Sequence, residues 1–201
     1  MYWLHRFGHG VALVNYALDV TAMYCLLGKR NCLTVGWNRF SNMQSADYNP
    51  DIVNAVETGN SKQLMTLMLN AGKNSAWARS LVNFAEMQIG DIVVVFPNKD
   101  VIPYFSIVEI KSSAKSILKS PTGMTTPFKV SGTNYSFSTN SGWIYNQSSV
   151  LDVGFFHEVE LLTGSLPRAL IGNMFNAYRR TNSPINDVSK QQHIDSLISK
   201  P

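Results

Sequence analysis

The clearest pattern of apolar positions in the chain is a pair of short runs separated by a polar segment. The first run, residues 92–96, is Ile-Val-Val-Val-Phe, and the second, residues 104–110, is Tyr-Phe-Ser-Ile-Val-Glu-Ile. β-branched and aromatic residues are enriched in strands, and the Pro-Asn-Lys-Asp segment at 97–100 is typical of a turn. The pattern predicts an antiparallel hairpin centred near Lys99 and Asp100 and buried on at least one face.

Weaker patterns predict the other elements. Strands are expected at residues 2–7, 32–37 and 153–162, and the last of these is expected to close the sheet. Helical spacing and capping residues predict helices over residues 11–27, 51–57, 61–70, 76–84 and 167–178, and a final amphipathic helix after Ser183. Asp51, Ser61, Ser75 and Ser183 are the expected caps.

Composition divides the chain further. Residues 111–149 are rich in Ser, Thr, Gly, Asn and Lys, which predicts a long insertion with weak strands around Phe128 and around residues 143–145. A polar and helical insertion is expected at about 41–72. We therefore expect a barrel-like domain over residues 1–162 and C-terminal helices over 163–201 that pack on it or extend from it.

The overall composition narrows the class of protein. The chain has 201 residues, of which 45% are hydrophobic, and a net charge of +4, which permits a polyanionic partner without requiring one. Cys25 and Cys32 are too few for a disulfide scaffold or a structural zinc site, so a reducing, cytoplasmic location is expected. Asn15 and Asp19 interrupt the apolar residues 11–27, which favours a buried amphipathic helix over a membrane span. No cofactor is implied.

Three features together resemble the PUA-like superfamily of small β-barrels. They are a tryptophan-containing helix, the M-x-x-G-D-x-V-V-V sequence at residues 87–95, and a strand ending in V-E-I at 108–110. Within the superfamily the similarity is to EVE-type, modified-base-reading domains, some of which stand at the front of modification-dependent restriction proteins. The resemblance implies an α+β fold with a small PUA-like mixed β-barrel, flanking helices and a C-terminal helical extension.

Aromatic residues near the predicted strands suggest a base-binding pocket. A base removed from its stack needs flat apolar walls with a few polar groups at the edge. The candidate residues are Trp37, Asn38, Phe40, Ser75, Trp77 and Arg79. The resemblance implies that the pocket positions correspond to Trp37 and Asn38, which follow the second strand, and to Ser75 and Trp77, which precede the Gly-Asp turn. Alternatively, the tryptophans are ordinary core residues, because Trp is highly buried on average.

Basic residues could follow a phosphate backbone. The candidates are Arg39, Lys111, Lys115, Lys119, Lys129, Arg179 and Arg180. The alternative for each is a solvated surface side chain.

A second function class is a metal-dependent nuclease. Asp91, Glu109 and Lys111 form a D-x17-E-x-K pattern, and a hairpin centred near residue 100 would place Asp91 opposite Glu109. The alternative is a turn Asp with a surface Glu and Lys, and no further acid completes a metal site. His5, His9 and His157 are expected to be satisfied or exposed rather than metal ligands.

The sequence therefore predicts a nucleic-acid-binding module, with DNA favoured over RNA. We expect it to recognise a flipped modified base as part of a restriction or defence system, without a membrane partner. The alternatives are the nuclease and a protein-interaction module that contacts an effector domain or partner protein through its C-terminal helices.

Overall fold

The structure, a computed structural model, describes most but not all of the chain. The described ranges are residues 1–7, 32–35, 50–97, 104–116, 128–130, 133–138, 142–145, 149–151, 155–178 and 182–199. Within these ranges strands and helices are mixed along the chain, which confirms the α+β class. The helix expected over residues 11–27 lies outside the described ranges.

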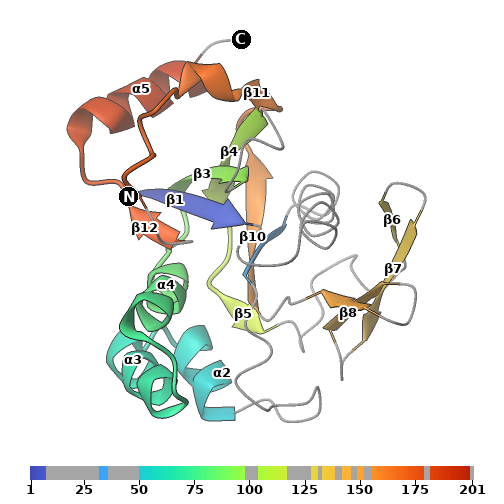
Figure 1. Ribbon diagram of the computed structural model, residues 1–201. Helices are drawn as coiled ribbons and strands as arrows, with labels where there is room; N and C mark the ends of the chain where they lie inside the picture. Colours follow the sequence, from blue (N-terminus) through green and yellow to red (C-terminus); the bar gives the residue numbers. More distant parts are fainter. Residues whose placement is uncertain are drawn as a thin grey trace.

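A mixed sheet forms the centre of the fold (Figure 1). Its strands are β1 (Tyr2–Phe7), β2 (Cys32–Val35), β3 (Ile92–Pro97), β4 (Tyr104–Ile110), β5 (Lys115–Ser116), β10 (Phe155–Leu161), β11 (Leu166–Pro167) and β12 (Asn182–Pro184). The order is β12-β1-β3-β4-β10-β2, while β5 pairs with β10 and β11 with β4. β1 and β3 are parallel, and the other pairs are antiparallel.

The predicted hairpin is confirmed, with its centre displaced by a fraction of a residue. β3 and β4 are antiparallel, with Val95 opposite Ser106 and Ile92 opposite Glu109. β10 was expected to close the sheet and instead lies inside it, between β4 and β2. Among the described strands, the end strands β12 and β2 do not pair with each other.

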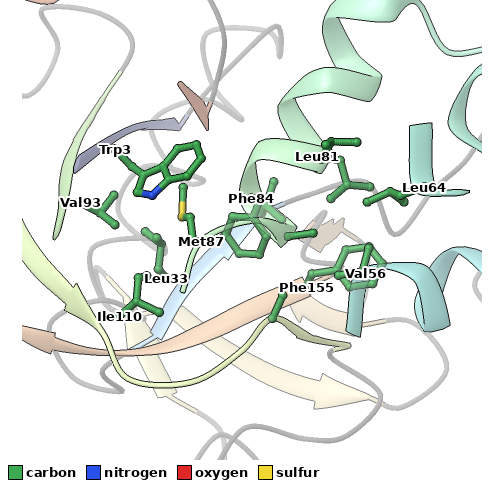
Figure 2. Packing of buried hydrophobic residues seen from close by; sticks show 14 of the residues in the cluster. Trp3, Leu33, Val56, Leu64, Leu81, Phe84, Met87, Val93, Ile110 and Phe155 are labelled. Carbon is green, nitrogen blue, oxygen red and sulfur yellow. The ribbon is translucent and has the colours of Figure 1, made fainter. Parts of the chain in front are cut away.

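Both faces of the sheet are covered, because alternate residues of each strand enter different cores. On one face, Trp3, Val93 and Ile110 pack with the helices α2 (Pro50–Glu57), α3 (Ser61–Asn70) and α4 (Ser75–Ala85). Figure 2 shows this core, with Trp3 near the strands and Phe84 of α4 beside them. On the other face, Leu4 and Val94 pack with the segment after β11 and with α5 (Val188–Ile198). Val-Val-Val in β3 is apolar throughout because both of its faces are buried.

The helices have different caps from those expected. Asn60 accepts a hydrogen bond from the Gln63 backbone at 3.1 Å, and Asn74 accepts one from the Trp77 backbone at 2.9 Å. Ser61 and Ser75 are thus the first helical residues, not the caps. These two expected caps were wrong by one position because two polar residues stand side by side at each helix start. Asp51 likewise lies in the first turn of α2 and does not precede it.

The C-terminal part differs more from the expectation. The helix predicted over 167–178 is a short 3₁₀ helix, η2 (Arg168–Leu170), followed by consecutive turns. Ser183, expected to cap the last helix, lies in β12, which pairs with β1. Asp187 caps α5 instead, by accepting from the Ser189 and Lys190 backbones. The C-terminal part therefore contributes a strand to the main sheet as well as a helix.

The segment expected as a loop insertion contains a second sheet. Its strands are β6 (Phe128–Val130), β7 (Thr133–Ser138), β8 (Gly142–Tyr145) and β9 (Ser149–Leu151). They form an antiparallel meander in chain order, which confirms the weak strands expected near Phe128 and residues 143–145. In Figure 1 this sheet lies apart from the main one.

Candidate nucleic-acid surface

Asp91, the first residue of the expected nuclease set, is a buried structural acceptor. Its Oδ2 accepts hydrogen bonds from Trp3 Nε1 at 2.7 Å and from the Gln88 backbone at 3.0 Å, and its Oδ1 lies 2.6 Å from the Met1 nitrogen. Gly90, which precedes it, has a φ of +88°, a left-handed conformation that favours glycine. The Gly-Asp turn therefore anchors the start of β3 to β1.

Glu109 and Lys111 lie on the opposite face of the sheet from Asp91. Ile92 opposes Glu109, while the Ile110 backbone N–H donates to the Asp91 carbonyl at 2.9 Å. The expected pairing of Asp91 with Glu109 was thus wrong by one residue, and one residue of slip moves a side chain to the other face of a sheet. The structure separates the carboxylates that a shared metal ion would need, and no group of three metal-ligating residues occurs among the described residues.

Two of the expected phosphate-binding lysines are held by carboxylates. Lys111 Nζ lies 2.9 Å from Glu109 and 2.7 Å from Glu160, and Lys115 Nζ lies 3.4 Å from Glu158. Three carboxylates thus surround two ammonium groups, so this cluster is negative overall. A phosphate backbone would be repelled by it, which argues against Lys111 and Lys115 as backbone contacts.

Several expected contact residues lie outside the described part of the structure. These are Trp37, Asn38, Arg39, Phe40, Lys119, Arg179 and Arg180, together with the side chain of Lys129 on β6. Their roles stay predictions.

The described aromatic candidate, Trp77, is on the surface of the helical layer. Its side chain is 50% exposed, and Lys73 Nζ lies 5.7 Å from the centroid of its ring. Trp77 lies in the first turn of α4. Phe84, which contacts the sheet residues His5 and His157, lies almost two turns further along the same helix. The rise of an α-helix puts these two aromatic residues about 10 Å apart along the axis, so Trp77 is not against the sheet.

Ser75 and Arg79 do not share a face of α4 with Trp77. Both are exposed, and residues four apart on a helix are neighbours, whereas residues two apart point in different directions. The sequence suggested that the three side chains belong to one pocket. On α4 they do not form one pocket wall. The residue that joins Trp77 is Lys73, which sequence reasoning did not select.

The segment around Trp77 carries positively charged side chains and no acidic ones. The segment from Thr58 to Ala85, which contains α3 and α4, has no acidic residue and has the cations Lys62, Lys73 and Arg79. We call this segment the α3–α4 hairpin. The absence of acidic residues from this hairpin and the position of Lys73 shortly before Trp77 are visible in the sequence. These two features could have identified the hairpin as a candidate surface. An exposed indole beside an ammonium group, on a segment without acidic residues of its own between Glu57 and Glu86, can stack a base and bind its phosphate.

The histidines considered as metal ligands have protein partners. His157 Nδ1 and Nε2 each lie 2.8 Å from a backbone carbonyl, those of Ser112 and Phe84. His5 Nδ1 lies 2.6 Å from the side-chain oxygen of Asn182. Both side chains therefore contact protein groups, while His9 lies outside the described ranges.

Comparisons with known proteins give no relative for this chain. No protein-family model matches it, and no similar protein was found among curated proteins or among solved structures. Among the described residues, no helix combines the length and the apolar character that crossing a membrane needs.

Proposed function

We propose that this chain is a non-catalytic nucleic-acid-binding module and that Trp77 is its base-stacking residue. The observation that carries the proposal is the exposed Trp77 ring with Lys73 Nζ 5.7 Å from its centroid, on a hairpin without acidic residues. Aromatic side chains stack bases of any sequence, and nearby cations bind the adjoining phosphates. Trp77 is not among the buried residues that α3 and α4 contribute to the core.

The proposal extends to the finer function that the resemblance implies. A PUA-like domain of a restriction or defence system would hold a flipped modified base, with DNA favoured over RNA. That pocket would depend on Trp37, Asn38 and Phe40. Stacking on Trp77 needs none of these three residues, so the two parts can be tested separately.

The competing functions have less support. Asp91 accepts from Trp3 and Gln88 through Oδ2 and from the Met1 nitrogen through Oδ1, and it faces away from Glu109, which weakens the nuclease. The protein-interaction alternative places a partner at the apolar face of the last helix. Ile194 and Leu197 of that helix are buried against the sheet, so this face is already used.

The first prediction is that Trp77→Ala weakens binding to a labelled single-stranded oligonucleotide. The loss of one stacked base costs about 1–3 kcal/mol, or about a 5- to 150-fold rise in Kd. Fluorescence anisotropy at low salt measures this, and Trp77→Phe should retain most of the affinity. The matched control is Ile89→Ala, because Ile89 is an exposed apolar residue outside the hairpin.

A salt series on the same oligonucleotide separates charge from stacking. Lys73→Gln should lower the magnitude of the salt slope by about 0.7, the value for one phosphate contact on a single strand. Trp77→Ala and Lys111→Gln should leave the slope unchanged, since stacking releases few ions and Lys111 already pairs with carboxylates. Absence of binding by the unaltered chain at low salt, or unchanged affinity in Trp77→Ala, would reject the proposal.

A further inference from the structure

The strands β6 to β9 place all of their aromatic residues on one face of their sheet (Figure 1). Tyr135 of β7 lies opposite Phe128 of β6 and opposite Tyr145 of β8, so these three positions form a row across the strands. Phe137 lies opposite Trp143 in the neighbouring row. Residues paired across two strands, and residues two apart on one strand, belong to the same face of a sheet. The two rows therefore share a face.

The opposite face of this sheet has a polar composition. Its positions on β6 and β7 are Lys129, Asn134, Ser136 and Ser138, and no aromatic residue of the four strands belongs to it. Such alternation is typical of an antiparallel sheet whose two faces have different surroundings. The aromatic face also differs from an aliphatic core, because Tyr and Trp combine a flat apolar ring with a polar group and are enriched at binding surfaces.

The charge of this part of the chain indicates the class of ligand. From Ser116 to Leu151 the sequence contains Lys119 and Lys129 and no Asp or Glu. The whole chain has a net charge of +4. A polyanion is the complementary partner, whereas an uncharged polymer such as a polysaccharide gains no attraction from these charges. A single strand of nucleic acid combines the negative backbone with flat bases that stack on aromatic rings.

The spacing of the aromatic positions suits successive bases of such a strand. Paired positions on neighbouring strands are about 5 Å apart, and positions two apart on one strand are about 7 Å apart. The bases of a single strand can separate from one another and stack individually on aromatic residues of a four-stranded sheet. Two rows of aromatic positions on neighbouring strands can therefore receive more than one base.

We propose that the aromatic face of the β6–β9 sheet is a second binding surface for a single strand of nucleic acid. The class of ligand rests on the proposed function, whereas the surface belongs to a different segment of the chain from Trp77. Tyr135 has the central position, since its register partners on both sides are aromatic.

The first test measures binding of labelled oligothymidylate to variants of the full chain at low salt. Tyr135→Ala should raise the Kd about fivefold or more, because it removes a stacking ring, and Tyr135→Phe should retain most of the affinity. Asn134→Ala is the matched control, because Asn134 is the neighbouring position on the opposite face, and it should bind as the unaltered chain does. A lower unfolding midpoint in Tyr135→Ala with an unchanged Kd would assign the ring to a core and overturn the inference.

A second test needs no substitution on the sheet. Oligothymidylate is cross-linked to the unaltered chain by ultraviolet light, and the attached peptides are identified by mass spectrometry. We expect cross-links within residues 128–145 and at Trp77, and Trp77→Ala should leave the first group in place. Cross-links at Trp77 alone would overturn this inference, and cross-links at residues 128–145 alone would overturn the role of Trp77, so the two proposals can fail separately. Tighter binding of an uncharged glucan oligosaccharide than of oligothymidylate would also overturn this inference.

Discussion

At the scale of single residues, the face on which a side chain lies decides its role. Asp91 and Glu109 form an attractive acidic pair in the sequence, yet a shift of one position in pairing places them on opposite faces. Asp91 accepts hydrogen bonds from Trp3 and Gln88, while Glu109 forms an ion pair with Lys111. The sequence predicted the hairpin but not this difference, because turn residues do not determine the register to within one position.

The two carboxylates should therefore differ in their effect on stability. Asp91→Ala leaves the buried indole N–H of Trp3 without its acceptor, which costs about 1–3 kcal/mol in the free energy of unfolding. Glu109→Ala removes a half-exposed ion pair and should cost about 1 kcal/mol or less. Urea denaturation measures both, and equal losses would contradict this assignment of roles.

His157 is the residue whose protonation should couple stability to pH. Burial lowers the pKa of its imidazole from the ordinary value of 6.5, although its contacts with the Ser112 and Phe84 carbonyls act in the opposite direction. The unfolded chain therefore binds a proton more readily than the folded protein. The contribution of His157 to stability is complete above the unfolded pKa and declines as the pH falls below it toward the folded pKa.

We expect the free energy of unfolding to fall between about pH 7.5 and about pH 5.5, and to fall less in His157→Gln, which does not titrate. Chemical denaturation at both pH values provides the measurement. The same pH dependence in the variant and the unaltered chain would show that His157 does not titrate differently on folding.

At the scale of elements, local pattern predicted well where packing agreed with it. The strands of the central hairpin and the helices α2, α3 and α4 have strong propensity and periodicity, and they occur close to their expected bounds. β12 has the sequence Asn-Ser-Pro, which carries no strand signal. Its conformation comes from distant partners: Asn182 contacts His5, and its backbone N–H donates to the Ser80 hydroxyl at 3.0 Å. A pattern that covers only a few neighbouring residues does not include partners so distant in the chain.

Asn182 should therefore be the most sensitive residue of β12. Asn182→Ala removes the acceptor for His5 and the donor to the Ser80 carbonyl, both in a fully buried place, and should cost about 1–3 kcal/mol or more in the free energy of unfolding. Asn173→Ala is the control, because the Asn173 side chain is exposed and accepts from the exposed Asn176, and it should change stability by about 0.5 kcal/mol or less. A thermal or urea unfolding series compares them, and a small cost for Asn182→Ala would mean that backbone pairing alone positions β12.

At the scale of the whole molecule, the sheet separates two cores. The α3–α4 hairpin belongs to one face, and the segment after β11 and α5 cover the other. The sequence predicted the mixed class and the aromatic candidate Trp77. It could not show that Asn182 lies beside His5, because that contact depends on packing between distant segments.

The pairing of β1 also has a consequence for how the chain acquires its fold. β1 is synthesised before its neighbours, yet the Trp3–Asp91 hydrogen bond spans 88 residues and the His5–Asn182 contact spans 177. One edge of β1 therefore stays open on the ribosome until β3 has emerged, and the other stays open until β12 has emerged. Non-local pairing of this kind folds slowly and leaves strand edges exposed to other chains, so the growing polypeptide depends on chaperones or on low concentration more than the finished protein does.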